Sequence, residues 1–474
     1  MPVILRDYQE KAVADAREAF REHRSVLLTK PTGSGKTLTA AFMLRSAMDK
    51  GLRSMFIVNR VELVKQTMVA FDLAEIDYGV VSAGFAMNPF PLVQIASIDT
   101  LKRRLHKVPT PKLIVWDECR SIAAKGWTGV YNAYPKAKHL GLDATPERLD
   151  GTGLGKFFTA LVHGPSYSQL VEAGALVRFR VYAPDPPNLD AVHTEMGEFN
   201  KEEVDAIMGT PKVVGNIVEH YKSLALGKRG IGFACSVKRS IELVDAFRAA
   251  GINAAHLDGE SDSAYRDSVV GAFRRGEIDI LWNVNLFSAG FDVPGVEVII
   301  DAAPTQSVSM YLQRAGRGSR PFDGKLFCIH LDHAGNVFRH GMPDQDRTWT
   351  LEGREKKKGK KREQEVMAMS CPECLGAYPP APKCPYCGHV REVQSREVEE
   401  VAGQLQQITP EMVEALKKKR KFEVLRAPSL EALEEIGRER GNHENWARHV
   451  WDARQKGADR RAEQQAQAYL FPRR

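Results

Sequence analysis

The sequence predicts an α/β protein with two parallel sheets in tandem, followed by a small cysteine-rich module and a helical tail. From residue 25 to about residue 145, short apolar runs such as VLL, MFIV and LIVW alternate with amphipathic stretches of helical length. The alternation starts again with GIGFAC after the proline-rich stretch APDPPNLDA at 183–191. Alternation of this kind is typical of parallel sheets wrapped by helices, so we expect one such sheet in each half.

Bulk composition excludes several classes of protein. The 474 residues are 43% hydrophobic, which is enough to form two or three globular domains. The formal net charge of +7 weakly favours a polyanionic partner such as nucleic acid. The first residues, MPVILRDYQE, lack a signal segment, and no uncharged apolar run approaches the roughly 20 residues of a membrane helix. We therefore expect a cytoplasmic protein that does not associate with membranes.

A glycine-rich turn between an apolar run and a helical pattern predicts a phosphate-binding loop. Gly33 and Gly35 permit positive φ, so successive N–H groups can point inward at a helix N-terminus. Lys36 would reach the β and γ phosphates of a nucleotide, and the Thr37 hydroxyl would bind Mg²⁺. The chain has Lys30 where the general pattern has glycine, and an ordinary glycine turn is the alternative. The predicted nucleotide-binding residues here are Pro31, Thr32, Gly33, Ser34, Gly35, Lys36 and Thr37.

The run LIVWDECRS at 113–121 is an apolar strand with two acids at its carboxyl end. Ligands of open α/β sheets bind at that edge. We expect Asp117 to hold the Mg²⁺ ion and Glu118 to act as the general base that polarises the attacking water. Kinases and GTPases also fit these features.

The segment YLQRAGRGSRP at 311–321 supplies the catalytic groups expected from the second domain. It carries Gln313, Arg317 and Arg320, and its glycines argue against a simple core role. If the nucleotide lies in a cleft between the domains, the two arginines would stabilise the γ-phosphate charge in the transition state. A solvated basic loop is the alternative.

In their order, these motifs resemble those of superfamily 2 helicases and translocases. The similarity covers roughly residues 4–335 and is greatest to the branch of XPB-like and type III restriction-like motors, including compact phage-encoded members. Besides the three segments above, LRDYQ resembles the Q-type motif and LDATPER at 142–148 resembles motif III. The resemblance implies two RecA-like domains that hydrolyse ATP with Mg²⁺, and it implies that Gln9 reads adenine.

The same resemblance assigns contacts to nucleic acid and to the nucleotide. The segments VNRVELVKQ and ASIDTL resemble motifs Ia and Ib, GFACSVKRS resembles the motif IV region, and NVNLFSAGFDVPG resembles motif V. It places Gly290 and Asp292 near the ribose and phosphates. The nucleic-acid contacts that it implies are Asn59, Arg60, Ser97, Thr100, Cys235 and Ser236.

Two residues depart from the family pattern. Arg120 stands where many relatives have the histidine of DEAH or DECH, and Asp143 stands where motif III usually begins with serine or threonine. Both lie in the link between hydrolysis and movement, whereas the acids of the hydrolytic site are present. A simple ion-pairing role for Arg120 is as good an interpretation as a functional one.

Four cysteines at 371–387 predict a zinc ribbon. They form two Cys-x₂-Cys pairs separated by nine residues, namely Cys371, Cys374, Cys384 and Cys387. Four thiolates close a tetrahedral Zn²⁺ site and leave no position for water, so the zinc would be structural. Unligated or disulfide-paired cysteines are the alternative. The module would bind DNA at a fork or bind a partner protein.

The expected fold is two tandem RecA-like domains with parallel sheets, a small zinc ribbon and a helical C-terminal tail. The lysine-rich run at 353–364 fits either a solvated linker or a phosphate-binding segment. Trp446 and Trp451 fit a small helical core better than a base-stacking surface. The predicted boundaries are 1–165 and 166–350 for the two domains, 351–369 for the basic linker, 370–390 for the ribbon and 391–474 for the tail.

These features predict an ATP-dependent helicase or translocase, with DNA favoured as its track, that acts in replication, recombination or repair. A duplex translocase or annealing remodeller, and an RNA helicase, share the same motifs. A nucleotide-gated clamp without productive hydrolysis is the alternative from another class. It is disfavoured because every predicted catalytic residue is present: Lys36, Asp117, Glu118, Gln313, Arg317 and Arg320.

Overall fold

The computed structural model describes most of the chain in two compact units. One unit is Met1–Glu392 and the other is Val393–Arg474. The described residues are 4–148, 151–184, 187–189, 191–195, 197–284, 286, 295–353, 367–391, 419, 422–440, 443 and 445–455.

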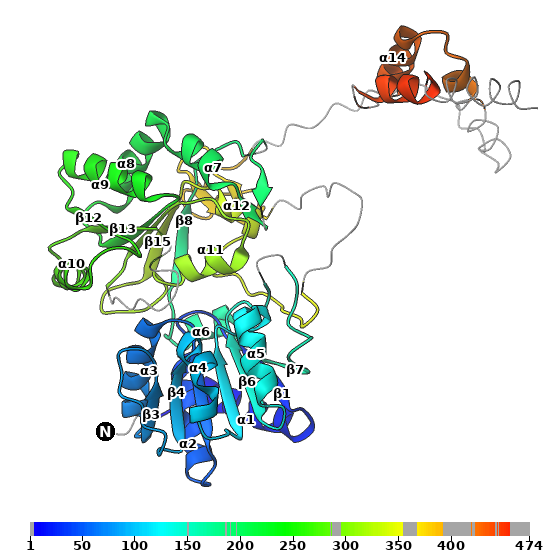
Figure 1. Cartoon of the computed structure of the whole chain (residues 1–474). Coiled ribbons are helices and arrows are strands. Elements are labelled where there is room, and N and C mark those ends of the chain that lie inside the picture. The colour runs from blue at the N-terminus through cyan, green and yellow to red at the C-terminus, as the bar shows by residue number, and fades with distance from the viewer. Residues whose placement is uncertain are drawn as a thin grey trace, which may run out of the picture. The chain divides into compact units, whose positions relative to one another are not determined.

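The first α/β domain follows the predicted alternation of strands and helices (Figure 1). Its elements are α1 (Asp7–Glu22), β1 (Ser25–Thr29), α2 (Lys36–Met48), β2 (Ser54–Val58), α3 (Val61–Leu73), β3 (Tyr78–Val81), β4 (Val93–Ser97), α4 (Ile98–Arg104), η1 (Leu105–Lys107), β5 (Leu113–Asp117), η2 (Cys119–Ala123), α5 (Lys125–Ala133), β6 (Lys138–Asp143) and β7 (Ala160–His163).

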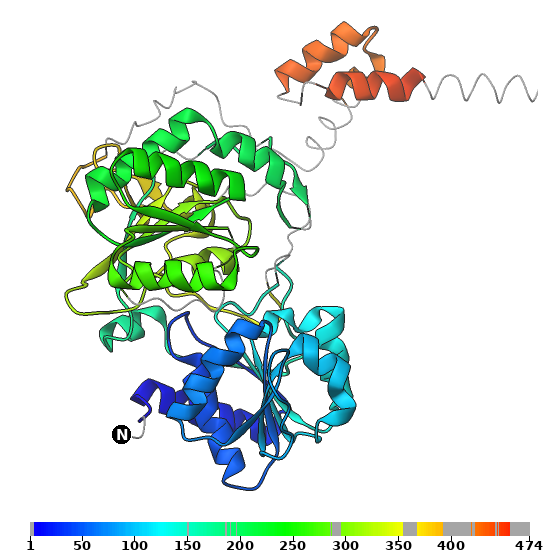
Figure 2. The same ribbon diagram turned by 60° about the vertical axis from the view of Figure 1, so that its left-hand side comes forward.

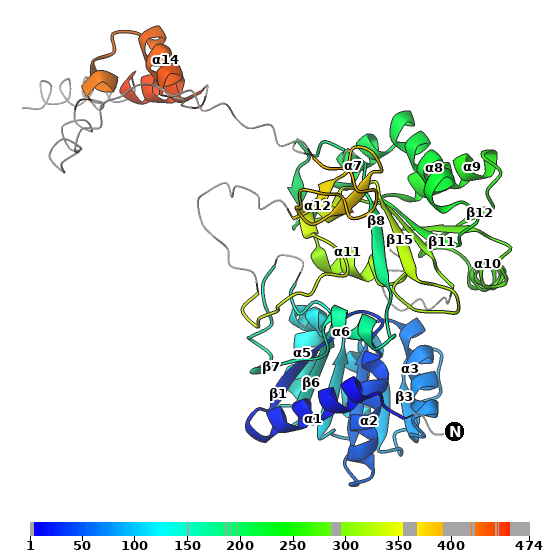
Figure 3. The same ribbon diagram turned by 180° about the vertical axis from the view of Figure 1, so that it is seen from behind.

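The strands of this domain form one seven-stranded parallel sheet in the order β3-β4-β2-β5-β6-β1-β7. Residues of β1 alternate between its two faces, since Val26 and Leu28 join the core beneath α1, α2 and α3, whereas Leu27 joins the core beneath α4 and α5. Figure 3 shows α1 and α2 over the first of these faces. Because both faces are covered, all five residues of β1 are buried, as in other parallel sheets.

The second domain repeats this architecture. Its elements are α6 (Tyr167–Glu172), β8 (Arg178–Tyr182), β9 (Thr194–Glu195), β10 (Glu198–Phe199), α7 (Lys201–Met208), α8 (Pro211–Ala225), β11 (Gly230–Ala234), α9 (Val237–Ala249), β12 (Ala254–Leu257), α10 (Ser263–Arg275), β13 (Ile280–Asn283), β14 (Val298–Ala302), α11 (Val308–Ala315), β15 (Phe327–Asp332), α12 (Asn336–His340), β16 (Met369–Ser370) and β17 (Gly376–Tyr378).

The second sheet has the order β12-β13-β11-β14-β15-β8-β17-β16. Strands β12 to β8 in this order are parallel, whereas β17 pairs antiparallel with β8 and β16 pairs antiparallel with β17. Helices cover both faces of the parallel part (Figure 2). The two strands of the cysteine module therefore extend the sheet of the second domain.

The segment after α12 returns to the first domain. The N–H of Gly155 donates to the Leu351 carbonyl over 2.9 Å, and Thr152 forms a bridge with Gly353. The Leu351 side chain packs against the first domain's core beneath α5. The first residues of the predicted basic linker, 351–353, thus pair with the first domain, and residues 354–366 lie outside the described part.

The second unit contains α14 (Leu430–Glu439) and a helical stretch at 446–455. Trp446 and Trp451 pack on a small core built on the buried Leu433. The prediction that these tryptophans serve a helical core is confirmed. Within the described ranges of the chain, no helix has the length and apolar character needed to span a membrane.

Candidate active site

The glycine-rich turn joins β1 to α2 at the carboxyl edge of the first sheet. Gly33 and Gly35 adopt left-handed conformations, with φ values of 85° and 76°. A Cβ atom on Gly35 would lie 2.6 Å from the amide nitrogen of Gln9, and one on Gly33 would lie 3.0 Å from Leu176. The left-handed conformation therefore favours glycine at both positions, and neighbouring side chains would have to shift to admit a Cβ atom. The turn leaves the Ser34 hydroxyl buried with no hydrogen-bond partner in the described structure.

Lys30 replaces the usual first glycine of this turn and is almost completely buried. Its ammonium group donates to the Thr39 hydroxyl over 2.7 Å and lies 5.6 Å from the centre of the Tyr8 ring. Burial, assisted by the nearby Lys36, lowers the pKa of Lys30 to about 7. The Lys36 ammonium lies 3.5 Å from the Lys30 carbonyl oxygen. The two lysines thus place one positive charge in the core beside Thr39 and a second positive charge at the turn itself.

Strand β5 brings Asp117 and Glu118 to the same edge. Burial and the adjacent Glu118 raise the pKa of Asp117 to about 7, although Lys36 acts in the opposite direction. Burial would also raise the pKa of Glu118, but Arg120, Lys36 and Arg317 together hold it below its ordinary value. Of the two carboxylates, Glu118 is therefore the one that these cations keep ionised at neutral pH. Its backbone is left-handed, with φ of 50° and ψ of 52°.

Helix α11 of the second domain contacts this edge directly. The Gln313 amide donates to the Glu118 carboxylate over 3.0 Å. A Cβ atom on Gly316 would lie 2.6 Å from the Thr32 methyl group, so this glycine permits close packing against the phosphate-binding turn. Burial lowers the pKa of Arg317 to about 10, opposed by Glu118, and burial also lowers the pKa of Arg320. Guanidinium groups desolvated in this way gain strongly from an anionic ligand.

The two departures from the family pattern meet in one buried ion pair. The Arg120 guanidinium donates to the Asp143 carboxylate over 2.7 Å, and the Arg120 backbone N–H donates to the same carboxylate over 3.0 Å. The same guanidinium nitrogen also contacts Glu118. Asp143 is fully buried, and Arg120 compensates its charge.

Comparisons with known proteins agree with this geometry. Residues 2–148 match the family model described as the res subunit of type III restriction enzymes, and residues 213–321 match the helicase conserved C-terminal domain. A 51.5 kDa protein of a Lactococcus phage is 31% identical over 373 residues, which is 78% of this chain and 79% of that protein. The chain belongs to the superfamily 2 helicases. It is accordingly an ATP-hydrolysing enzyme of the helicase class.

Further relatives and solved structures are similar over about 70% of the helicase. The DNA 3'-5' translocase XPB2 of Sulfurisphaera tokodaii is 22% identical, over 71% of this chain and 83% of that protein. The chain spans only 52% and 58% of two yeast relatives, from Saccharomyces cerevisiae and Schizosaccharomyces pombe. The type ISP restriction-modification enzyme LlaBIII bound to DNA has a TM-score of 0.54 at 17% identity, covering 69% of this chain and 28% of that chain. The predicted tandem RecA-like fold is confirmed.

The residues predicted to touch nucleic acid in the first domain lie at the ends of β2 and β4. Asn59 follows β2, and its side-chain oxygen is buried with no hydrogen-bond partner in the described structure. Arg60 is the N-cap of α3. The Ser97 hydroxyl donates to Thr100 over 3.0 Å and is buried, whereas Thr100 also accepts from the Ala83 N–H. The predicted contacts of these residues remain predictions.

In the second domain, Cys235 and Ser236 follow β11 and both contact Asp205. Ser236 caps α9, since its hydroxyl accepts from the Arg239 N–H over 3.1 Å. Burial, with help from Asp205, raises the pKa of Cys235 to about 12. Asp205, which no sequence motif singled out, places negative charge beside this predicted nucleic-acid contact. Gly290 and Asp292 lie outside the described residues.

The four cysteines of the predicted ribbon come together. Their sulfur atoms all lie within 4.8 Å of one another, with 3.6 Å between Cys371 and Cys387 and 3.7 Å between Cys374 and Cys384. A tetrahedral zinc site with Zn–S bonds of about 2.3 Å requires sulfurs about 3.8 Å apart. The donor set therefore fits one Zn²⁺ ion.

The two Cys-x₂-Cys turns are equivalent in backbone. The N–H of Leu375 donates to the Cys371 carbonyl, and the N–H of Gly388 donates to the Cys384 carbonyl. Both Leu375 and Gly388 are left-handed, with φ values of 58° and 78°. This conformation favours glycine, and Leu375 adopts it at a cost of about 1 kcal/mol.

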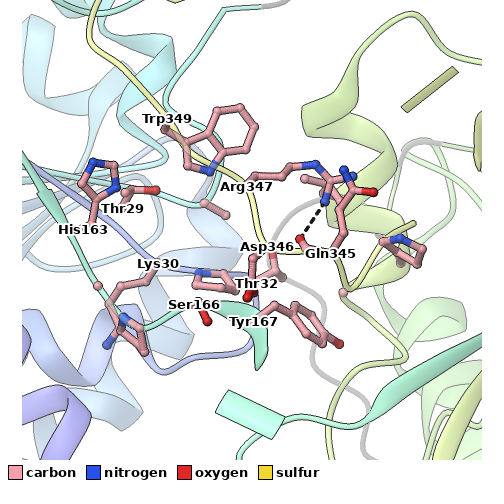
Figure 4. A pocket seen from close by; sticks show the side chains of 18 of the residues that line it. Thr29, Lys30, Thr32, His163, Ser166, Tyr167, Gln345, Asp346, Arg347 and Trp349 are labelled. Carbon is pink, nitrogen blue, oxygen red and sulfur yellow. Dashed lines mark hydrogen bonds between the residues drawn. The ribbon is translucent and has the colours of Figure 1, made fainter. Parts of the chain in front are cut away.

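A cavity of about 170 Å³ lies beside the phosphate-binding turn. Figure 4 shows side chains from the β1 end, the segment after β7 and residues 345–349 around it, including Lys30, Tyr167 and Trp349. Of the predicted phosphate-binding residues, only Pro31 and Thr32 line this cavity. It is therefore adjacent to the predicted nucleotide site rather than the site itself.

We predict that Lys30→Met stabilises the helicase most at low pH. The unfolded chain binds a proton on Lys30 below pH 10.5, whereas the folded chain binds it only below about pH 7. This group therefore lowers the free energy of unfolding fully below pH 7, and its penalty fades as the pH rises towards 10.5. The Thr39 hydroxyl keeps its 3.0 Å bond to the Gly35 carbonyl in the variant.

The measurement is the Tm of nucleotide-free protein at pH 6.5, 8 and 9.5. The difference in Tm between Lys30→Met and wild type should be positive and should shrink as the pH rises. The exposed lysine variant Lys107→Met serves as the control. An equal difference at all three pH values would contradict the prediction.

A second prediction concerns zinc. The full-length chain should contain about one zinc per chain, and Cys384→Ser should lose it because three thiolates leave the tetrahedral site open. Leu375→Gly is the matched control, since it alters the same kind of turn and keeps all four thiolates. Elemental analysis of both variants after dialysis gives the answer. Folded wild-type protein without zinc would refute the site.

Proposed function

We propose that this chain is an ATP- and Mg²⁺-dependent motor that moves on or unwinds DNA by closing and opening its two RecA-like domains. The observation that carries the proposal is the 3.0 Å hydrogen bond from Gln313 to Glu118, because it joins the second domain to the predicted general base of the first. A base held by both domains makes hydrolysis depend on their closure.

Each predicted residue has a role in this scheme. Glu118 accepts a proton from the attacking water, and its depressed pKa keeps it ionised. Lys36 binds the β and γ phosphates, and Arg317 and Arg320 stabilise the negative charge that develops on the γ-phosphoryl group. Thr37 and Asp117 would hold Mg²⁺, which neutralises phosphate charge when bound.

Adenine recognition is assigned to the N-terminal helix. At the start of α1 the Gln9 side-chain oxygen accepts from the Arg6 N–H over 3.0 Å, and the Gln9 N–H donates to the Arg6 carbonyl over 2.7 Å. The amide nitrogen of Gln9 lies close to Gly35 of the phosphate-binding turn. From this position Gln9 lies against the turn, and its side chain is the group that we assign to adenine recognition.

DNA is the favoured track because one relative and one solved structure that align along most of the chain carry DNA in their descriptions. The archaeal protein XPB2 carries the name of a DNA translocase, and the solved LlaBIII enzyme was bound to DNA. A match to an RNA helicase of Meyerozyma guilliermondii covers only 27% of the chain. Roles in replication, recombination or repair are part of the same proposal, as are the predicted domain boundaries at 165 and 350.

The decisive experiment measures ATP turnover by full-length protein alone and with single-stranded DNA, duplex DNA or RNA. Strong stimulation by DNA supports the motor and identifies its track, and a strand-separation assay then distinguishes unwinding from translocation. Greater stimulation by RNA would reassign the track. ATP binding without turnover in every condition would favour a nucleotide-gated clamp.

We predict that Arg317→Ala lowers kcat at least about a hundredfold while ATP still binds. An arginine that stabilises only transition-state charge affects turnover far more than ground-state binding. Lys36→Ala should abolish hydrolysis. The control is Arg275→Ala, which removes an exposed arginine paired with Glu277 at the end of α10. Wild-type turnover by the Arg317 variant would contradict a site shared by both domains.

A further inference from the structure

A closed set of polar contacts links the hydrolytic edge to α11 at two points. Gln313 of α11 donates to Glu118, and Glu118 contacts Arg120. Arg120 in turn contacts Asp143.

The set closes through motif III. The Asp143 carboxylate accepts from the Thr145 N–H over 3.0 Å. The Thr145 hydroxyl donates to the Ser309 hydroxyl over 2.7 Å. Ser309 and Gln313 are four residues apart on α11, so they lie on the same face of the helix. One face of α11 therefore contacts the general base at one end and motif III at the other.

Arg120 is the member on which the set depends. Its guanidinium contacts both Glu118 and Asp143, and its backbone N–H also binds Asp143. Burial would lower the pKa of Arg120, but Asp143 and Glu118 raise it above its ordinary value. One fixed cation thus compensates two carboxylates. Without it, Asp143 would be a buried charge with no compensating cation in its contacts, which is strongly unfavourable.

Asp143 determines where Arg120 can be. Because Asp143 is the last residue of β6 and is fully buried, its carboxylate is fixed by the sheet. It also forms part of the anchor of the phosphate-binding turn, since its carbonyl accepts from the Lys30 N–H over 3.0 Å. If Asp143 were neutral, Arg120 would keep Glu118 as its main partner and would pair more tightly with the base. Loss of Arg120 would leave the Asp143 charge uncompensated, and loss of Asp143 would let Arg120 pair more tightly with Glu118. We therefore expect either single loss to impair hydrolysis.

We propose that Arg120 and Asp143 act as one charge-paired unit that positions Glu118 for hydrolysis and transmits its state to α11 through Thr145 and Ser309. Arg120 is a positioning residue in this scheme, and the scheme rests on the proposed role of Glu118 as general base. Each charge of the pair compensates the other, so removing both leaves no uncompensated charge at this point. Exchange of both residues is then tolerated, whereas exchange of one is not.

The test is a double-mutant cycle with Arg120→His, Asp143→Thr and the double variant. Each single variant should lower DNA-stimulated kcat at least about tenfold, equivalent to about 1.4 kcal/mol, while KM for ATP changes little. The double variant should return to within about threefold of wild type, so the two effects are strongly non-additive. The control cycle uses Lys228→Met and Glu297→Gln, an ion pair of 2.8 Å at the amino ends of β11 and β14, two central strands of the second sheet.

If the single variants fold poorly, a further variant tests whether the state of Glu118 is transmitted to α11. Ser309→Ala removes the α11 end of the set without touching Glu118 or Arg120. It should reduce the stimulation of turnover by DNA more than it reduces turnover without DNA. A purely structural ion pair would not produce this difference.

The outcomes separate this inference from the proposed function. Wild-type turnover that does not respond to nucleic acid would refute the motor itself. A stimulated wild type with additive losses in the cycle, or unchanged stimulation in Ser309→Ala, would refute the paired unit and leave the motor intact. Recovery in the double variant together with reduced stimulation in Ser309→Ala supports it.

Discussion

Charge compensation at the carboxyl edge of the first sheet is the constraint on which the site depends. Parallel strands deliver their last residues to one edge, and burial there penalises every charge that lacks a partner of opposite sign. At this edge the first domain brings the basic groups Lys30, Lys36 and Arg120 together with the acidic groups Asp117, Glu118 and Asp143. The second domain adds Arg317 and Arg320, whose positive charge suits the negative charge of Mg²⁺-bound ATP.

The cysteine module covers β8, which would otherwise be an exposed edge strand of the second sheet. Strand β8 would end the parallel sheet with unpaired backbone groups, and such edges promote aggregation. Strand β17 pairs with β8 instead, the Ser370 hydroxyl donates to the Ala183 carbonyl over 2.6 Å, and Tyr386 stacks on Tyr182. A zinc ion holding the cysteines would thus also hold the strand that covers this edge, which is a structural role independent of any contact with DNA.

The sequence predicted the fold well because the apolar runs, glycine turns and acids of a parallel sheet are local signals. The positions of Lys36, Asp117 and Glu118 follow from such signals, since Lys36 follows a glycine turn at the start of a predicted helix and the two acids come at the end of a predicted strand. The contacts of Thr39, Thr145 and Ser309 do not, because a hydroxyl carries no sequence signal for a partner many residues away. Lys30 shows a third case: the sequence revealed the departure from glycine, but only packing showed that its ammonium group is buried against Thr39 and Tyr8.

Arg120 and Asp143 show why departures from a family pattern must be considered together. Taken singly, an arginine in place of histidine and an aspartate in place of serine each weaken the expectation of a coupled motor. The structure brings them within 2.7 Å, and each removes the penalty that the other would impose. The fully buried Asp143 is fixed by β6, and Arg120 contacts both Asp143 and Glu118. In the proposed scheme, Arg120 and Asp143 therefore preserve the link between hydrolysis and α11, and they do so as a pair of opposite charges.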